Sequence, residues 1–240
     1  MHNTIHWLLP NNPPDSFPDV TKALRSPDGL LAIGGDLSPE RIILAYRHGI
    51  FPWYNEGQPI MWWSPDPRAV IFPDEFHVSR SLRRKLRSGT FSVSIDQCFD
   101  KVIVNCANSH CDTGTWITED MLEAYHKLHE LGYAHSVETW QKNQLVGGMY
   151  GLAIGKMFFG ESMYSAVPDA SKIALARLVH LLKQTGVKLL DCQVTSDHLL
   201  TLGMRPVPRK SFVEYLNLYI DSEPAVALWK KPPGSTTALW

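Results

Sequence analysis

The chain has 240 residues, of which 44% are hydrophobic and 20% charged, and its formal net charge is −1. This composition is typical of a globular protein larger than one average domain, so we expect one main core with a small additional unit. It excludes a protein coated with basic residues for binding long nucleic acids, and no segment approaches the roughly 20 consecutive apolar residues of a membrane span.

Two features predict a cytoplasmic protein with reduced thiols. The N-terminal residues lack the basic start, the long apolar stretch and the cleavage site of a secretory signal. The cysteines include no C-x-x-C pair, which argues against a zinc ribbon or a redox motif. These cysteines are Cys98, Cys106, Cys111 and Cys192.

The N-terminal part begins without a pattern of regular structure. Residues 1 to about 30 are rich in proline and polar groups, so we expect extended chain and turns there. Ser38 then supplies a helix N-cap, Pro39 suits the first helical position, and Gly49 ends the predicted helix.

The stretch that follows, residues 51–70, combines several prolines with three tryptophans. The prolines predict a break in regular structure, and Trp53, Trp62 and Trp63 supply more aromatic surface than a linker needs. Two interpretations stay open. The tryptophans either pack the N-terminal unit onto the main one or present a flat apolar face to a ligand.

A basic stripe is predicted on the next helix. Ser79 caps this helix, Leu82 and Leu86 are spaced to face inward, and four arginines at i, i+3, i+4 and i+7 share one face without an acidic residue. They are Arg80, Arg83, Arg84 and Arg87. The stripe is either a solvated face or an anion-binding surface, and we favour anion binding because solvated helices usually mix both signs of charge.

The central part predicts one helix and then a set of hairpins. A helix begins after Thr118, an N-cap followed by acidic residues, and ends at Gly132. Three β-forming segments separated by short turns predict an antiparallel sheet. They are residues 134–140, 144–154 and 157–163. The glycines of the second segment, Gly147, Gly148 and Gly151, predict a bulge or the close approach of another backbone.

The last part alternates helix and strand. Residues 170–185 predict an apolar helix, residues 187–194 a strand buried on both faces, and residues 209–219 a final helix. This order of elements indicates an α+β fold on a mixed sheet.

Three polar residues on the predicted strands are candidates for chemistry. Asp191 and Gln193 are two positions apart, so their side chains are expected on one face, where they share either a reactive site or a structural polar network. Glu161 lies among apolar residues and therefore needs a partner. That partner is either a lysine such as Lys172 or a cationic group of a substrate.

Other kinds of site are not indicated. His126, His129 and His135 lack the H-E-x-x-H or paired-cysteine pattern of a metal site, so we predict no metal. No G-x-S-x-G turn is present, so a serine nucleophile and covalent catalysis are not supported.

Nine blocks of the sequence resemble, in the same order, the leucyl/phenylalanyl-tRNA-protein transferase family of bacteria. They run from about Gly29 to Gly203 and are together far more specific than any short motif. The blocks are GLLAIGGDLSPERIILAYRHGIFPW, WWSPDPRAV, HVSRSLRR, GTWIT, AYHKLHELGYAHSVE, LVGGMYG, GESMYS, ASK and LLDCQVTSDHLLTLG.

This resemblance implies both a fold and an activity. The expected fold is a small N-terminal α/β domain (1–65) followed by a larger acetyltransferase-like (GNAT-like) mixed-sheet domain (66–240), as in peptidoglycan-bridge aminoacyltransferases. The expected activity moves leucine, phenylalanine or methionine from charged tRNA to the N-terminal arginine or lysine of an acceptor protein, which marks that protein for N-end-rule degradation. A monomer without a cofactor is expected.

The resemblance also implies where the substrates bind. Trp53 and Trp116 would stack around the terminal adenosine of the tRNA, with Tyr46 and Tyr125 nearby, and the arginine stripe would hold the acceptor stem. The donor side chain would enter an apolar pocket whose methionines adapt to its shape. The expected pocket residues are Met149, Met163, Leu175, Leu178, Leu182 and Leu190. This chain departs from the family at 178 and 182, where aromatic residues are frequent.

For the reaction, the resemblance assigns Gln193 to the attacking amine and Asp191 to its polarisation. A neutral amide is a very weak base, so we interpret Gln193 as an acceptor that orients the amine. Asp191 then holds that amide or stabilises positive charge, and Glu161 helps to receive the acceptor protein. Two rival functions stay open: an acyl-CoA N-acyltransferase, although its pyrophosphate loop is not found, and a non-catalytic tRNA-binding module.

Overall fold

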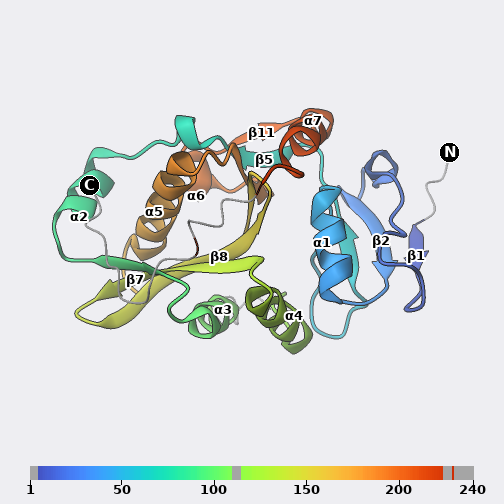
Figure 1. Cartoon of the computed structure of the whole chain (residues 1–240), viewed down its shortest axis with the longest axis horizontal. Helices are drawn as coiled ribbons and strands as arrows, with labels where there is room; N and C mark the ends of the chain where they lie inside the picture. The colour runs from blue at the N-terminus through green and yellow to red at the C-terminus, as the bar shows by residue number, and fades with distance from the viewer. Residues whose placement is uncertain (1–4, 110–114, 224–228, 230–240) are drawn as a thin grey trace.

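The computed structural model describes residues 5–109, 115–223 and 229, which form two β-sheets with helices packed on them (Figure 1). The smaller sheet has the order β1-β2-β4-β3, in which β1 and β2 are parallel and the other neighbours antiparallel. This N-terminal part contains β1 (His6–Leu8), the 3-10 helix η1 (Val20–Lys22), β2 (Leu30–Gly34), α1 (Pro39–Arg47), β3 (Phe51–Pro52) and β4 (Met61–Trp63).

The larger sheet has the order β11-β5-β10-β9-β8-β7-β6 in the described residues, and only its β9–β10 pair is parallel. Its strands are β5 (Arg68–Ile71), β6 (Ser92–Ile95), β7 (Ala134–Gln141), β8 (Gln144–Ile154), β9 (Met157–Ser165), β10 (Leu189–Gln193) and β11 (Arg205–Val207). The accompanying helices are η2 (Pro73–Glu75), α2 (Arg80–Arg87), α3 (Phe99–Asn108), α4 (Glu119–Glu130), α5 (Ala170–Gln184), α6 (Asp197–Leu200) and α7 (Arg209–Tyr219).

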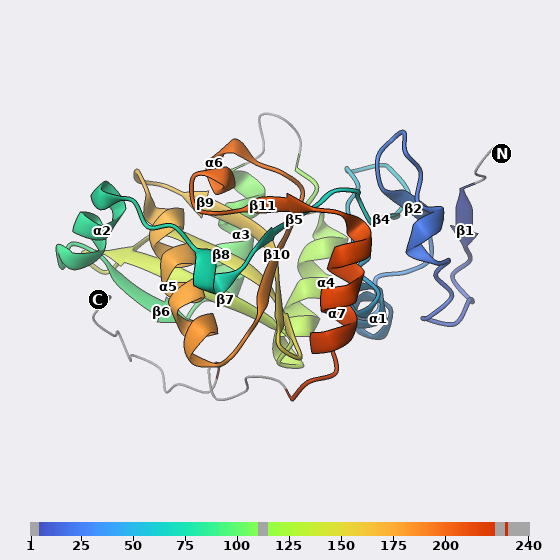
Figure 2. The ribbon, with the colours of Figure 1, turned by 90° about the horizontal axis from the view of Figure 1, so that it is seen from above.

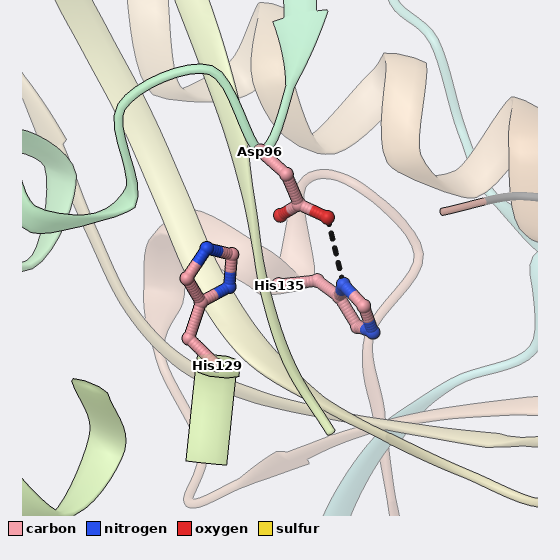
Figure 3. A group of neighbouring side chains, drawn as sticks. All are labelled: Asp96, His129 and His135. Carbon is pink, nitrogen blue, oxygen red and sulfur yellow. Dashed lines mark hydrogen bonds and ion pairs between the residues drawn. The ribbon is translucent and has the colours of Figure 1, made fainter. Parts of the chain in front are cut away.

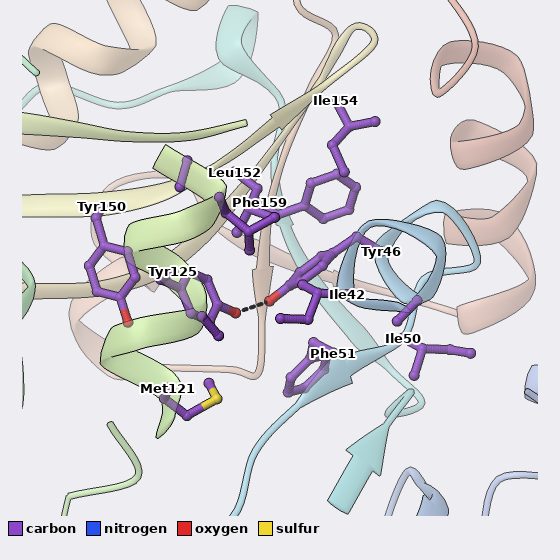
Figure 4. Packing of buried hydrophobic residues seen from close by; sticks show 14 of the residues in the cluster. Ile42, Tyr46, Ile50, Phe51, Met121, Tyr125, Tyr150, Leu152, Ile154 and Phe159 are labelled. Carbon is purple, nitrogen blue, oxygen red and sulfur yellow. Dashed lines mark hydrogen bonds between the residues drawn. The ribbon is translucent and has the colours of Figure 1, made fainter. Parts of the chain in front are cut away.

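Helices cover both faces of the larger sheet (Figure 1; Figure 2). On one face α5 forms an apolar cluster with strand residues such as Val137, Met149 and Leu190. On the other face α3 and α4 contribute to a second cluster, which continues into α1 and β3 of the N-terminal part (Figure 4). This second cluster therefore holds the two sheets together.

The boundaries of the predicted helices agree with the structure, and capping side chains explain two of them. The Ser79 hydroxyl accepts a hydrogen bond from the Leu82 N–H at 3.2 Å, and the Thr118 hydroxyl accepts one from the Met121 N–H at 3.3 Å. α1 begins at Pro39 as predicted.

Two glycines of β8 allow neighbouring elements to approach the strand closely, as their positions inside the strand predict. A Cβ on Gly147 would collide with the Cβ of Ala170 at the start of α5. A Cβ on Gly151 would collide with the carbonyl oxygen of Phe159 in β9, and the register of the two strands shifts at this point. The predicted bulge and close packing are therefore confirmed.

Several elements are not predicted by the sequence patterns. β6 and α3 lie in a stretch without a clear signal, and β3 to β5 lie in the stretch where prolines predict a break. Pro52 is compatible with β3 because this strand forms the edge of its sheet. A proline there lacks an N–H but removes no hydrogen bond to a neighbouring strand. Strands of two to four residues gain their stability from neighbours rather than from their own pattern.

The mixed arrangement of helices and strands agrees with the predicted fold class at that coarse level. Cys98, Cys106 and Cys192 carry free thiols, and Cys111 lies outside the described residues. In the described part of the chain, no helix is long and apolar enough to cross a bilayer.

Candidate active site

A cavity of about 570 Å³ lies where β8, β9, β10 and the beginning of α5 meet. Its walls are largely apolar, and Glu161 is the single carboxylate among the described residues that line it. Trp116, from the segment before α4, and His198, from α6, also line the cavity. An apolar pocket with a few polar groups is the usual form of a small-molecule site.

Glu161 accepts three hydrogen bonds from residues of three different segments. Tyr46 of α1 donates its hydroxyl at 2.6 Å, Tyr125 of α4 donates at 2.9 Å, and the side-chain amide of Gln193 donates at 2.9 Å. Of the two partners that the sequence leaves open, Lys172 is not the one, because it pairs with Asp169 at 3.2 Å. Hydroxyl and amide groups, rather than a cation, hold this carboxylate.

The two tyrosine hydroxyls also lie 2.7 Å from each other (Figure 4). The two hydroxyls and the Glu161 carboxyl group make three oxygen–oxygen contacts: one between the tyrosines and one from each tyrosine to Glu161. The tyrosines supply two hydroxyl protons, so a third proton, on Glu161, allows every contact to be a hydrogen bond. Both tyrosines are fully buried, so neither presents its ring to a nucleobase in this structure.

The pKa of Glu161 is raised from its ordinary value to about 7. Burial is the main cause, because it disfavours the ionised carboxylate, and the nearby charge of Asp191 acts in the same direction. The hydrogen bonds from Tyr46, Tyr125 and Gln193 oppose the increase. Glu161 therefore exchanges its proton near neutral pH.

Asp191 forms a buried ion pair with Arg68, a residue that the sequence analysis does not single out. The guanidinium donates from Nε and Nη2 to the two carboxylate oxygens at 2.8 and 2.6 Å, and both side chains are fully buried. Arg68 also donates to the Gly49 carbonyl at 3.0 Å and lies over the rings of Phe51 and Phe212. The available signal was an arginine beginning the apolar strand β5.

Gln193 ends β10 in a left-handed conformation, with φ of 65°. Its N–H donates to a carboxylate oxygen of Asp191 at 2.9 Å, and the register of β10 against β5 shifts between these two residues. Simple strand alternation therefore does not describe this end of β10. The side chain of Asp191 reaches Arg68, whereas that of Gln193 reaches Glu161.

Four of the six residues predicted for the donor pocket line the cavity; they are Met149, Met163, Leu175 and Leu190. Leu178 and Leu182 do not line it and are fully buried. They share the stripe of Leu175 on α5 but lie roughly 4.5 and 10 Å further along the helix axis. They pack in the core behind the pocket.

The two tryptophans expected at the tRNA terminus lie on neighbouring segments. Trp116 lines the cavity, whereas Trp53 does not line it and is 42% exposed. The hydroxyls of Tyr54 and Thr118, close in sequence to these tryptophans, lie 3.4 Å apart. The fold therefore brings the Trp53 segment beside the Trp116 segment.

The arginine stripe lies on the surface of α2. Its four arginines are exposed, and none forms an ion pair with a described residue. Lys85 of the same helix binds Asp169, directly before α5, at 2.5 Å, and Ser171 of α5 lines the cavity. α2 is therefore attached to the helix that borders the cavity.

Among the described residues, one group of three side chains lies close enough to hold a metal ion. It consists of Asp96, His129 and His135. None of the three lines the cavity beside Glu161.

Residues 35–66 match the family described as "Leucyl/phenylalanyl-tRNA protein transferase N-terminal domain", and residues 70–217 match "Leucyl/phenylalanyl-tRNA protein transferase". The second range alone is more than half of the chain. This chain belongs to the leucyl/phenylalanyl-tRNA protein transferase family. The two matched ranges meet where the smaller sheet ends and the larger one begins.

Similar transferases are known from several bacteria. The leucyl/phenylalanyl-tRNA–protein transferase of Stutzerimonas stutzeri (strain A1501) is 56% identical over 217 residues, which cover 90% of this chain and 95% of that one. The transferase of Pseudomonas fluorescens (strain Pf0-1) is 54% identical over 227 residues, which cover 94% and 99%. Among solved structures, L-PGS from Bacillus licheniformis aligns at 12% identity over 78% of this chain and 65% of that one, with a TM-score of 0.37, too remote a likeness to support a conclusion.

Replacing Asp191 with alanine is expected to lower the free energy of unfolding by about 3–5 kcal/mol, because it leaves the Arg68 guanidinium buried without its partner. The double variant Arg68→Met/Asp191→Leu is expected to lose clearly less than the sum of the Asp191→Leu and Arg68→Met variants. Urea unfolding of the four variants and the wild-type protein measures both effects. Strictly additive losses would show that the pair is not coupled.

The raised pKa of Glu161 predicts a pH-dependent stability. Because the folded pKa exceeds the unfolded one, the protonated carboxyl favours folding below about pH 5, and this contribution is lost as the pH rises through about 7. The isosteric Glu161→Gln variant lacks it. Between pH 5 and 8 the wild-type protein should therefore lose roughly 2–3 kcal/mol relative to Glu161→Gln in urea unfolding, and parallel pH profiles would contradict the assignment.

Proposed function

We propose that the cavity beside Glu161 binds the aminoacyl end of a charged tRNA, and that this chain there transfers leucine or phenylalanine to the N-terminus of an acceptor protein. The observation that carries the proposal is the combination of an apolar cavity with one partly buried carboxylate of raised pKa, in a member of the transferase family. The cavity volume lies within the usual range of about 300–1,000 Å³ for such sites.

The reaction is aminolysis of an ester that is already activated. The α-amine of the acceptor attacks the aminoacyl carbonyl carbon, a C–N bond forms, and the bond to the ribose oxygen breaks. One proton leaves the amine and one proton joins the ribose oxygen, so the protein needs no external oxidant or cofactor. Holding the two reactants in a near-attack geometry can remove about 7–11 kcal/mol of the barrier.

Glu161 is suited to receive the attacking amine. A carboxylate has about four lone-pair positions, and Tyr46, Tyr125 and Gln193 use three of them. Because Glu161 lines the cavity, the remaining position is available to an N–H group of a substrate. Its pKa of about 7 lies close to the reference value of about 8 for an α-amine, which suits transfer of a proton between the two groups.

Gln193 and Asp191 then have different tasks. The side-chain oxygen of Gln193 forms no hydrogen bond with any described residue, and its neighbours Cys192 and Val194 line the cavity. We therefore assign this oxygen to orienting the amine that binds beside Glu161. Asp191 acts as a positioning residue, because its carboxylate is held by Arg68 and accepts the N–H of Gln193. Because Arg68 already holds the Asp191 carboxylate, we prefer this role to the one in which Asp191 directly stabilises positive charge on the amine.

The binding of the tRNA follows from three surfaces. Trp116 at the cavity and the exposed Trp53 provide stacking faces for the terminal bases, worth about 1–3 kcal/mol for each base. Met149, Met163, Leu175 and Leu190 surround the donor side chain. The exposed arginine stripe of α2 provides positive charge for phosphates of the acceptor stem.

The finer features of the function belong to the same proposal. We infer that methionine is a third donor because the methionine side chains lining the cavity adapt their shape, and that the acceptor begins with arginine or lysine. The two parts of the chain, 1–65 and 66–240, then act as domains, with a GNAT-like fold in the larger one. The protein works as a cytoplasmic monomer.

The decisive experiment is transfer of labelled leucine from charged tRNA to a peptide that begins with arginine. The Glu161→Gln variant keeps the shape of the side chain but removes the carboxylate that accepts the amine proton. We expect its transfer rate to fall at least about 100-fold, while its affinity for charged tRNA stays within about twofold. Filter binding measures the affinity.

Glu138→Gln is the matched control. Glu138 is a carboxylate of the same sheet that also has a raised pKa, but it is fully buried, bonds to Ser94 and Ser136 and does not line the cavity. Its variant should transfer leucine at the wild-type rate. Undiminished transfer by Glu161→Gln would reject the proposed site.

Replacing Arg83 and Arg84 together with alanine should weaken tRNA binding at low salt. Each phosphate contact adds about 0.7–0.9 to the slope of log affinity against log salt concentration, so the loss of two contacts should reduce the slope by about 1.4–1.8. The test is to measure tRNA affinity at several salt concentrations between about 50 and 200 mM and to determine the slope from these values.

The control for this charge change is the Lys101→Ala/Lys210→Ala variant. Both lysines are exposed on helices other than α2, namely α3 and α7, so the variant removes the same charge elsewhere. It should keep the wild-type salt dependence. An unaltered slope for the arginine variant would mean that the stripe is a solvated face.

A further inference from the structure

A second cavity of about 560 Å³ shares no lining residue with the one beside Glu161. It is bordered by the end of α4, the beginnings of β7 and of the loop after β6, and residues near the end of α7. Asp96, His129 and His135 line this cavity together, and each offers a ligand atom within 4.8 Å of the other two (Figure 3). The transferase reaction uses none of these three side chains.

The hydrogen bonds of the two histidines define which nitrogens carry protons. Carbonyl oxygens only accept, so Nδ1 of His129 donates to the Ala134 carbonyl at 2.8 Å and Nε2 of His135 donates to the Gly132 carbonyl at 3.1 Å. In neutral rings the lone pairs then lie on Nε2 of His129 and on Nδ1 of His135. Donation of the other ring N–H to a carbonyl is the common arrangement of metal-binding histidines.

The carboxylate of Asp96 is also held in place. One of its oxygens accepts the Ser136 N–H at 2.8 Å, and the other lies 2.8 Å from Nδ1 of His135 (Figure 3). With Nδ1 unprotonated, both atoms of this close contact are acceptors and repel each other. A proton between the two atoms, or a metal ion bound by both, removes the repulsion.

Aromatic stacking limits the movement of both imidazoles. The ring of His129 stacks on Phe99, with centroids 4.2 Å apart, and the ring of His135 stacks on Trp229, with centroids 3.9 Å apart. The side chain of His135 is only 6% exposed and that of Asp96 17% exposed. The group is thus a shielded set of ligands rather than a solvated ion pair.

We propose that Asp96, His129 and His135 form a binding site for a divalent transition ion of the Zn²⁺ class. Two imidazole nitrogens and one carboxylate oxygen are a donor set that suits Zn²⁺, with bonds of about 2.0–2.2 Å and an open position for water. Tetrahedral ligands at that distance lie about 3.3 Å from one another. Binding therefore draws the more distant ligand atoms, now within 4.8 Å, toward one another and lengthens the 2.8 Å contact between Asp96 and His135. The ion then ties α4, β7 and the loop after β6 together.

The linear sequence predicts no metal because no ligand motif is present. The spacing of these residues, 96, 129 and 135, matches no such motif, and Asp96 comes from a separate strand end. Its left-handed backbone, with φ of 53°, is a conformation that aspartate and asparagine tolerate better than most residues. The ligand set therefore exists only in the folded chain.

The test is titration of the full, untagged chain with Zn²⁺ after removal of metals by a chelator, followed by calorimetry. We expect one Zn²⁺ for each chain and a higher melting temperature with Zn²⁺ than without it. X-ray absorption of the zinc complex should show nitrogen and oxygen neighbours without sulfur. This measurement on the wild-type protein does not depend on how variants fold.

Three conservative variants, Asp96→Asn, His129→Gln and His135→Gln, should each weaken Zn²⁺ binding more than about tenfold. His126→Gln is the matched control, because His126 lies on the same helix and contacts acidic groups, Asp100 and Glu130, on the exposed surface. It should bind Zn²⁺ as the wild-type protein does. No calorimetric binding by the wild type, sulfur neighbours, or unchanged binding by the three variants would overturn the proposal.

Discussion

The buried ion pair between Arg68 and Asp191 is the interaction on which the rest of the site depends. It joins β5 to β10, and the same guanidinium reaches the Gly49 carbonyl after α1 and the Phe212 ring of α7. Two fully buried charges are stable only when both are paired and hydrogen-bonded, so this contact fixes the relative position of four segments. The backbone N–H of Gln193 donates to Asp191, so the ion pair also fixes the position of Gln193.

The carboxylate of Glu161 connects this framework to the cavity. Its hydrogen bonds come from α1, α4 and the end of β10, so the N-terminal part of the chain contributes directly to the ionisation of a residue in the larger sheet. Burial raises its pKa to about 7, which places proton exchange near the pKa of an amine. The packing of the two sheets against each other thus also influences the pKa of Glu161.

The local features of the fold could be predicted from the sequence. The caps Ser79 and Thr118, the hairpin segments and the close approach at Gly151 depend on residues near one another in the chain, and the structure agrees with them. The partners of the polar residues could not be predicted in this way. The sequence leaves a lysine such as Lys172 or a substrate cation open as the partner of Glu161, but Tyr46 and Tyr125 bond to it in the folded chain. Alternation along β10 likewise fails at the bulge before Gln193.

The sequence by itself determined the family, the order of most helices and strands, the arginine stripe and the identity of Glu161 and Gln193 as candidates. These depend on motifs and on helical or strand periodicity, which are written into neighbouring positions. Only the tertiary structure decided that Arg68 pairs with Asp191, that Tyr46 bonds to Glu161, and that Asp96 meets two histidines. The first two contacts join residues 123 and 115 positions apart, and such a pairing is selected by the packing of the whole chain rather than by any local pattern.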